Sequence, residues 1–114
     1  MSVEALWSVE FKSNLQLFGS GVVIFETGRV FGGDSTFYYV GDYEVRNNEI
    51  EGLISITNYS GNNHSVIGSG NNFNIRLKGP IKSPKMELAG HRVDAPDVKV
   101  IVSLIRRAEL PNPK

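Results

Sequence analysis

The segment TFYYVGDYEVRNNEIEGLISIT, residues 36–57, decides the fold class of this chain. Apolar and polar residues alternate in its first half, as in a β-strand with one buried face. The apolar face carries Phe37, Tyr39, Tyr43 and Val45, and the polar face carries Asp42, Glu44 and Arg46. Asn47-Asn48 indicates a two-residue turn, because asparagine tolerates positive φ. Isoleucines then align at positions 50, 54 and 56. The segment therefore predicts a β-hairpin.

Outward from this hairpin, strand-like segments recur along the whole chain. They are residues 3–12, 15–26, 29–33, 72–78, 85–93 and 98–106. Turn residues separate them, and the longest connection, 58–72, has room for one helical turn. About eight short strands in a meander predict an all-β fold, an antiparallel up-and-down barrel whose closure removes sheet edges. A two-sheet sandwich is the structural alternative, and 58–72 is its only candidate crossover.

Glycines interrupt the alternation of apolar and polar residues in two places. Residues 15–26 are apolar on both faces, and Gly19 and Gly21 in their middle indicate a bulge, a bend or a close backbone approach. Gly28 and the run Gly32-Gly33-Asp34 indicate structural turns with positive φ. The run also matches the Gly-Gly-Asp core of cyclic-dinucleotide synthases. Those enzymes are α/β domains larger than this chain, so we favour the turn.

Composition narrows the function classes. With 114 residues the chain fits one domain, residues 1–110, followed by a frayed tail, 111–114. Lysine plus arginine equals aspartate plus glutamate at 12 each, so no overall field attracts nucleic acid or anionic membranes. There is no cysteine, and the N-terminal residues do not resemble a signal peptide. We expect a cytoplasmic protein that contacts neither nucleic acid nor membrane.

The motifs that could carry chemistry are incomplete. Neither Gly19-Ser20-Gly21 nor Gly68-Ser69-Gly70 completes a phosphate-binding loop. The two histidines, His64 and His91, lack the spacing of metal ligands. Arg106-Arg107 forms a basic patch with Lys85 and Lys99, without the interleaved aromatic residues of a single-strand binder. We expect no catalytic residue, no metal and no cofactor, and hence no enzyme.

The glycine pattern resembles that of the GrlR-like family, named for a negative regulator of type III secretion. The matching residues are Gly19 and Gly21, Gly28, Gly32-Gly33-Asp34, then Tyr39 and Gly41, with Trp7 ahead of Phe11 in the first strand. The resemblance implies an eight-stranded lipocalin-like barrel and a homodimer. It also implies contact with a transcriptional regulator through an acidic surface loop. The corresponding loop here is Arg46-Asn47-Asn48-Glu49, which holds only one acid.

Three functions compete. The first is a non-enzymatic bacterial regulatory or adaptor protein that binds another protein through its loops and the barrel exterior, with Arg46, Asn47, Asn48 and Glu49 as the partner-binding loop. The second is a binder of a small apolar ligand inside the barrel. Its candidate pocket consists of Trp7, Phe37, Tyr39, Tyr43 and Phe73. The third is a small barrel isomerase or cyclase, which would need convergent buried polar groups.

Overall fold

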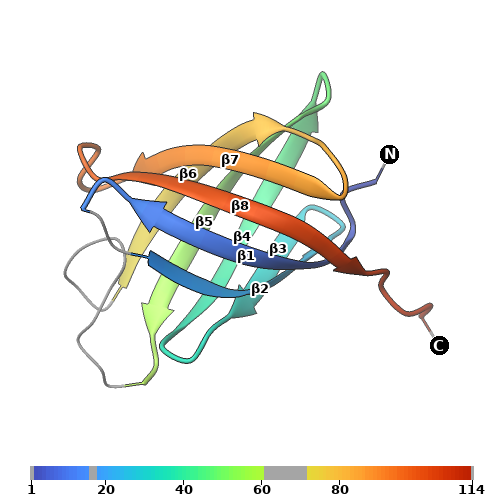
Figure 1. Cartoon of the computed structure of the whole chain (residues 1–114), viewed down its shortest axis with the longest axis horizontal. Coiled ribbons are helices and arrows are strands. Elements are labelled where there is room, and N and C mark those ends of the chain that lie inside the picture. Colours follow the sequence, from blue (N-terminus) through green and yellow to red (C-terminus); the bar gives the residue numbers. More distant parts are fainter. Residues whose placement is uncertain (1, 16–17, 61–71, 114) are drawn as a thin grey trace.

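The computed structural model describes residues 2–15, 18–60 and 72–113, and they form a closed barrel of eight antiparallel strands (Figure 1). The strands are β1 (Ala5–Ser13), β2 (Phe18–Glu26), β3 (Arg29–Gly33), β4 (Phe37–Arg46), β5 (Glu49–Asn58), β6 (Asn72–Pro80), β7 (Lys85–Arg92) and β8 (Lys99–Ala108). Each pairs with the next in sequence, and β8 pairs with β1. The all-β, up-and-down barrel predicted from the alternation is confirmed, and the sandwich is not.

The β4–β5 hairpin has the predicted register. Arg46 pairs with Glu49, so Asn47 and Asn48 alone make the turn, with φ of 51° and 62°. Such positive φ values suit the right-handed twist of the flanking strands. In Figure 1 this hairpin is the green loop at the top of the view, and it projects beyond the neighbouring turns. The strands thus carry the residues 46–49 to an exposed tip.

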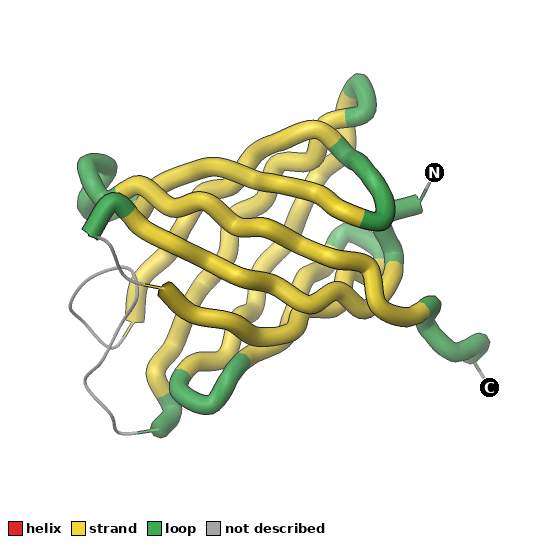
Figure 2. Tube along the Cα trace, viewed as in Figure 1, coloured by secondary structure: helices red, strands yellow, loops and turns green. Residues whose placement is uncertain are grey.

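The barrel interior is the hydrophobic core. Alternate residues of every strand point inward, as the period of two requires. β6 illustrates this, since Phe73, Ile75 and Leu77 are buried while the residues between them are exposed. Figure 2 shows strands forming nearly the whole described wall, with loops only at its two ends. The described residues contain no helix that is long and apolar enough to cross a membrane.

Some predicted boundaries differ from the observed ones. The predicted strand 72–78 ends two residues too early, because β6 continues through Pro80, which pairs with Glu49. The final strand begins at Lys99 rather than Val98, whose N–H bonds to the carbonyl of Ala95 within the preceding turn. Of the predicted 58–72 loop, Asn58 ends β5 and Asn72 begins β6. Residues 61–71, and with them the helical turn, lie outside the described residues.

The glycines of β2 mark a close approach and not a bulge. Pairing of β1 with β2 runs without a break from Ala5–Phe25 to Lys12–Phe18. A Cβ atom on Gly21 would lie 2.7 Å from the carbonyl oxygen of Gly33, closer than real Cβ atoms come. The register shift of the barrel lies between Leu6 and Trp7, where β1 meets β8.

Candidate functional site

The barrel interior offers little free space. The larger cavity has a volume of about 60 Å³ and is lined by side chains that include Tyr39 and Tyr43. A second, of about 30 Å³, is lined by residues that include Phe37, Tyr39 and Phe73. Ligand sites usually have volumes of roughly 300 Å³ or more. Four of the five predicted pocket residues therefore meet cavities, but these cavities are too small for such a ligand.

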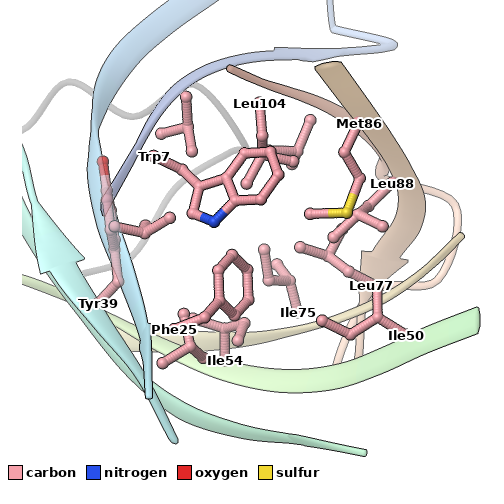
Figure 3. Close-up of a cluster of buried hydrophobic side chains, with 14 of the residues drawn as sticks. Trp7, Phe25, Tyr39, Ile50, Ile54, Ile75, Leu77, Met86, Leu88 and Leu104 are labelled. Atoms are coloured by element: carbon pink, nitrogen blue, oxygen red, sulfur yellow. The ribbon is translucent and has the colours of Figure 1, made fainter. Parts of the chain in front are cut away.

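Trp7, the fifth predicted pocket residue, packs in the core beneath one end of the barrel. Figure 3 shows its indole in the middle of the buried cluster, next to Phe25. The two rings meet edge to face, with centroids 6.3 Å apart. Its Nε1–H donates a hydrogen bond of 2.9 Å to the carbonyl oxygen of Val3. Arg106 covers the indole, with its guanidinium carbon 5.7 Å from the ring centroid. Trp7 is thus held as a structural residue.

Arg92 closes the opposite end, and the sequence interpretation missed it. Its side chain is only 10 % exposed and lies 4.7 Å above the ring of Phe73. Its Nε and Nη2 donate to the two carboxylate oxygens of Asp94, at 2.9 and 2.7 Å. These hydrogen bonds hold the pKa of Asp94 below its usual value. Position 92 continues the inward phase of Met86 and Leu88, which is the signal that could have placed Arg92 inside.

The predicted structural turn is organised by Asp34. One carboxylate oxygen accepts hydrogen bonds from the backbone N–H groups of Thr36 and Phe37, at 2.7 and 2.8 Å. The other accepts from the hydroxyl of Tyr39. Burial, and then this bond to a carboxylate, raise the pKa of Tyr39 far above its ordinary value. The Tyr39 phenol therefore stays protonated, and the Asp34 carboxylate is hydrogen-bonded both to this phenol and to the backbone of the turn.

Of the three glycines in the predicted turns, Gly28 adopts positive φ, of 78°, which glycine reaches without strain. The prediction of a turn with positive φ at Gly32 and Gly33 was wrong, because both residues lie within β3. Gly32 lies against β2, where a Cβ atom would come within 2.0 Å of the carbonyl oxygen of Val22.

The predicted partner-binding loop borders a surface hollow of about 660 Å³. Arg46, Asn47, Asn48 and Glu49 line it, and the flanking strands add Glu44, Glu51, Lys78 and Pro80. Glu44 and Glu51 pair directly across the two strands. Like charges in that position destabilise a sheet by a fraction of a kcal/mol. Together with Glu49 of the loop, Glu44 and Glu51 give the hollow three carboxylates.

Basic side chains partly balance these carboxylates. Arg46 lies 3.0 Å from Glu44, Lys78 lies 3.5 Å from Glu49, and Arg76 lies 3.6 Å from Glu51. All six side chains are about half exposed or more, so each pair contributes little to stability. They can exchange these partners for charges on another molecule.

The remaining motif residues do not form a reactive site. His91 lies on the outer phase of β7, and His64 and Gly68-Ser69-Gly70 lie outside the described residues. No cluster of three potential metal ligands occurs within residues 2–15, 18–60 and 72–113. Within the same ranges, every buried side-chain nitrogen and oxygen has a hydrogen-bond partner. Arg106 of the predicted basic patch turns inward to Trp7, so the patch loses one of its arginines.

The comparison with known proteins adds no identification. No family model matches the chain, and neither does any curated protein.

Proposed function

We propose that this chain is a non-enzymatic bacterial regulatory or adaptor protein that acts in the cytoplasm by binding another protein. The observation that carries the proposal is the β4–β5 hairpin, which projects from the barrel above a polar hollow of about 660 Å³. Glu44, Glu49 and Glu51 face this hollow with Arg46 and Lys78. Such a surface complements a partner segment of mixed or basic charge, and exposed charges mainly set specificity and association rate.

The resemblance to the GrlR-like family supports the same proposal. The partner-binding loop of that family corresponds here to residues 46–49, which contain one acid. Glu44 and Glu51 on the flanking strands supply further acids beside this loop. We therefore propose a transcriptional regulator with a basic contact segment as the partner, and a homodimer as the working form. Neither nucleic acid nor a membrane is part of the proposal.

The filled interior weighs against the alternatives. A small apolar ligand would need several times the roughly 60 Å³ available among the core side chains. An isomerase or cyclase would need buried polar groups free to act, whereas Tyr39 and Asp34 are bonded to each other. The exterior is where this barrel offers accessible, chemically varied surface.

A charge-reversal pull-down tests the proposal. The bait is the purified chain in native lysate, compared with the triple variant Glu44→Lys, Glu49→Lys and Glu51→Lys. The matched control, Glu10→Lys with Glu87→Lys, changes exposed glutamates on other strands. We expect one protein to be enriched by the wild type and the control and lost from the triple variant. Repeated recovery of no specific protein, or equal recovery by all three baits, contradicts the proposal.

A further inference from the structure

Charged side chains on the outer barrel surface mostly face an opposite charge on the next strand. The cross-strand pairs of this kind among the described strands are Glu26–Arg29, Arg29–Asp42, Arg46–Glu49 and Glu51–Lys78. Like charges directly opposite each other destabilise a sheet, so they need a separate reason. The acidic exception, Glu44 opposite Glu51, lines the hollow at the β4–β5 hairpin.

The basic exception is a row across β6, β7 and β8. Arg76 pairs with His91, and His91 pairs with Lys99. Each of the three has a buried neighbour in sequence, so alternation points their own side chains away from the core. Directly opposed residues have Cβ atoms about 5 Å apart, which lets one small ligand reach all three side chains. Arg76, His91 and Lys99 are called the basic row below.

The basic row has little internal neutralisation. Within the described residues, neither the His91 side chain nor the Lys99 side chain has an ion pair or a hydrogen bond. Arg76 lies 3.6 Å from Glu51, but both side chains are about half exposed. Such a pair contributes little to stability, and Arg76 can exchange Glu51 for another anion.

The charged groups around His91 come from three elements. They are Arg76 and Lys78 on β6, Lys99 on β8, and Asp94 and Asp97 in the turn after β7. Asp94 is already engaged, since Arg92 donates two hydrogen bonds to its carboxylate. Asp97 is exposed at the far side of the turn. The side chains directly opposite His91 on both neighbouring strands are therefore cations.

The backbone that carries Lys99 is fixed by Asn14. The Asn14 N–H donates to the carbonyl oxygen of Lys99 at 3.1 Å, and the Asn14 side-chain oxygen accepts from the N–H of Lys99 at 3.0 Å. The amide group of Asn14 also donates to the carbonyl oxygen of Asp97 at 2.7 Å. Paired strands hold Arg76 and His91 in the same way. A frame ordered before binding reduces the entropy lost when a ligand binds.

We infer that the basic row binds a tetrahedral oxyanion with two negative charges, namely the phosphate group of a phosphate ester. The planar guanidinium of Arg76 suits two oxygens of such a group at once, and the ammonium of Lys99 adds a second positive charge. His91 lies between them as a third donor. An imidazole gains its second proton as the pH falls through the neutral range, so the site binds more tightly in mild acid.

This inference goes beyond the proposed function and does not rest on it. The basic row lies on β6–β8, whereas the proposed protein partner contacts the β4–β5 hairpin. A free phosphate ester and a phosphorylated side chain of another protein present the same group to the basic row. Titration with both kinds of ligand separates these two sources.

Sulfate tests the pH dependence, because it keeps both negative charges between about pH 5.5 and pH 8, the range in which histidine titrates. Amide shifts in nitrogen–proton NMR spectra, recorded at constant ionic strength, give the dissociation constant. We expect saturable shifts centred on the basic row, and binding at least about threefold tighter at the acidic end of the range. His91→Gln should remove this difference. The absence of saturable shifts at the basic row, or an unchanged pH dependence in His91→Gln, overturns the inference.

Charge-neutral variants test the two permanent cations. Arg76→Gln and Lys99→Gln should each weaken sulfate binding at least about fivefold, because each removes one charge-assisted contact. The matched control is Arg29→Gln, which removes an exposed arginine with acids on both neighbouring strands. The control should change the dissociation constant by less than about twofold. Glu51→Gln should tighten binding, because it frees Arg76. Equal weakening by Arg29→Gln would reveal a general charge effect and contradict a site at the basic row, provided that thermal unfolding shows every variant folded.

Phosphorylated probes identify the source of the ligand. Free phosphoserine and a short alanine peptide with one central phosphoserine should both bind at the basic row, and serine and the unphosphorylated peptide should not. A peptide that binds at least about tenfold more tightly than phosphoserine assigns the site to a phosphorylated protein, and equal affinities assign it to a free ester. Failure of both phosphorylated probes overturns the inference. The triple glutamate variant retains the basic row and should still bind sulfate, so loss of the proposed partner and loss of the anion are separate results.

Discussion

At the scale of single residues, Asp34 and Tyr39 join a turn to the core. The Asp34 carboxylate accepts from the turn backbone and from the Tyr39 hydroxyl, and Tyr39 also borders both interior cavities. We predict that Tyr39→Phe lowers the free energy of unfolding by about 2 kcal/mol, because a buried hydrogen bond to a charged group is lost. Urea unfolding measures the change, with Tyr38→Phe as the exposed control. Equal effects of the two substitutions would show that the bond contributes nothing.

The raised pKa of Tyr39 gives this residue a pH signature. Below the ordinary tyrosine pKa of 10.0 the phenol is protonated in both folded and unfolded chains, so its contribution is fully present. Above that value the unfolded chain loses the proton while the folded chain keeps it. Stability therefore falls as pH rises past 10. Tyr39→Phe should flatten this alkaline loss, whereas Tyr38→Phe should retain it.

At the scale of strands, two glycines set how closely neighbouring backbones approach. A Cβ atom on Gly90 would lie 1.6 Å from the carbonyl oxygen of Arg76, while one on Gly52 would meet its nearest atom, the Asp42 carbonyl oxygen, at 3.2 Å. We predict that Gly90→Ala destabilises the barrel by at least about 3 kcal/mol, because β6 and β7 must separate. Gly52→Ala should change stability by less than about 1 kcal/mol. Chemical denaturation of both variants provides the comparison.

Strand periodicity also shows how far the sequence could predict this structure. Alternation placed each strand within a few residues, and the Asn47-Asn48 turn within the right hairpin, because both depend on neighbouring residues. The close approach of Gly21 to Gly33 depends on two strands at once, so the sequence left it among three alternatives. Val22 and Ile24 made β2 apolar on both faces. Only the register of β2 with β3 and β4 shows that these two side chains share the outer surface with Phe31 and Val40.

At the scale of the whole molecule, Arg106 joins the two ends of the chain. Its guanidinium donates to the carbonyl oxygens of Ser2 and Glu4, at 2.8 and 3.2 Å, and covers Trp7. We predict that Arg106→Met lowers the free energy of unfolding by about 2–3 kcal/mol, because charge-assisted bonds are lost in a side chain only 17 % exposed. Thermal unfolding measures this, and Arg107→Met, at an exposed position, is the control. A loss of the same size in Arg107→Met would contradict a closing role for Arg106.

Sequence patterns missed both arginines that cover the ends of the barrel. Arg92 and Arg106 occupy the inward phases of β7 and β8, but a charged residue near a strand end is ordinarily assigned to solvent. Each instead covers an aromatic ring on a paired strand, Phe73 for Arg92 and Trp7 for Arg106. The Arg106–Trp7 pair becomes visible only when barrel closure brings β8 beside β1, whereas the Arg92–Phe73 pair joins the neighbouring strands β6 and β7.

The filled interior leads to a last prediction, which concerns ligand binding inside the barrel. The larger cavity has a volume of about 60 Å³, far below the roughly 300 Å³ of a ligand site, and its lining is apolar. A fluorescent fatty acid titrated into the wild type should therefore show no saturable binding. Phe25→Ala removes a buried ring beside Trp7 and enlarges this space, so it should take up benzene or xenon at a cost of about 3–5 kcal/mol in stability. Stoichiometric binding of the fatty acid by the wild type would instead require the core side chains to rearrange, and would make ligand binding the first of the candidate functions.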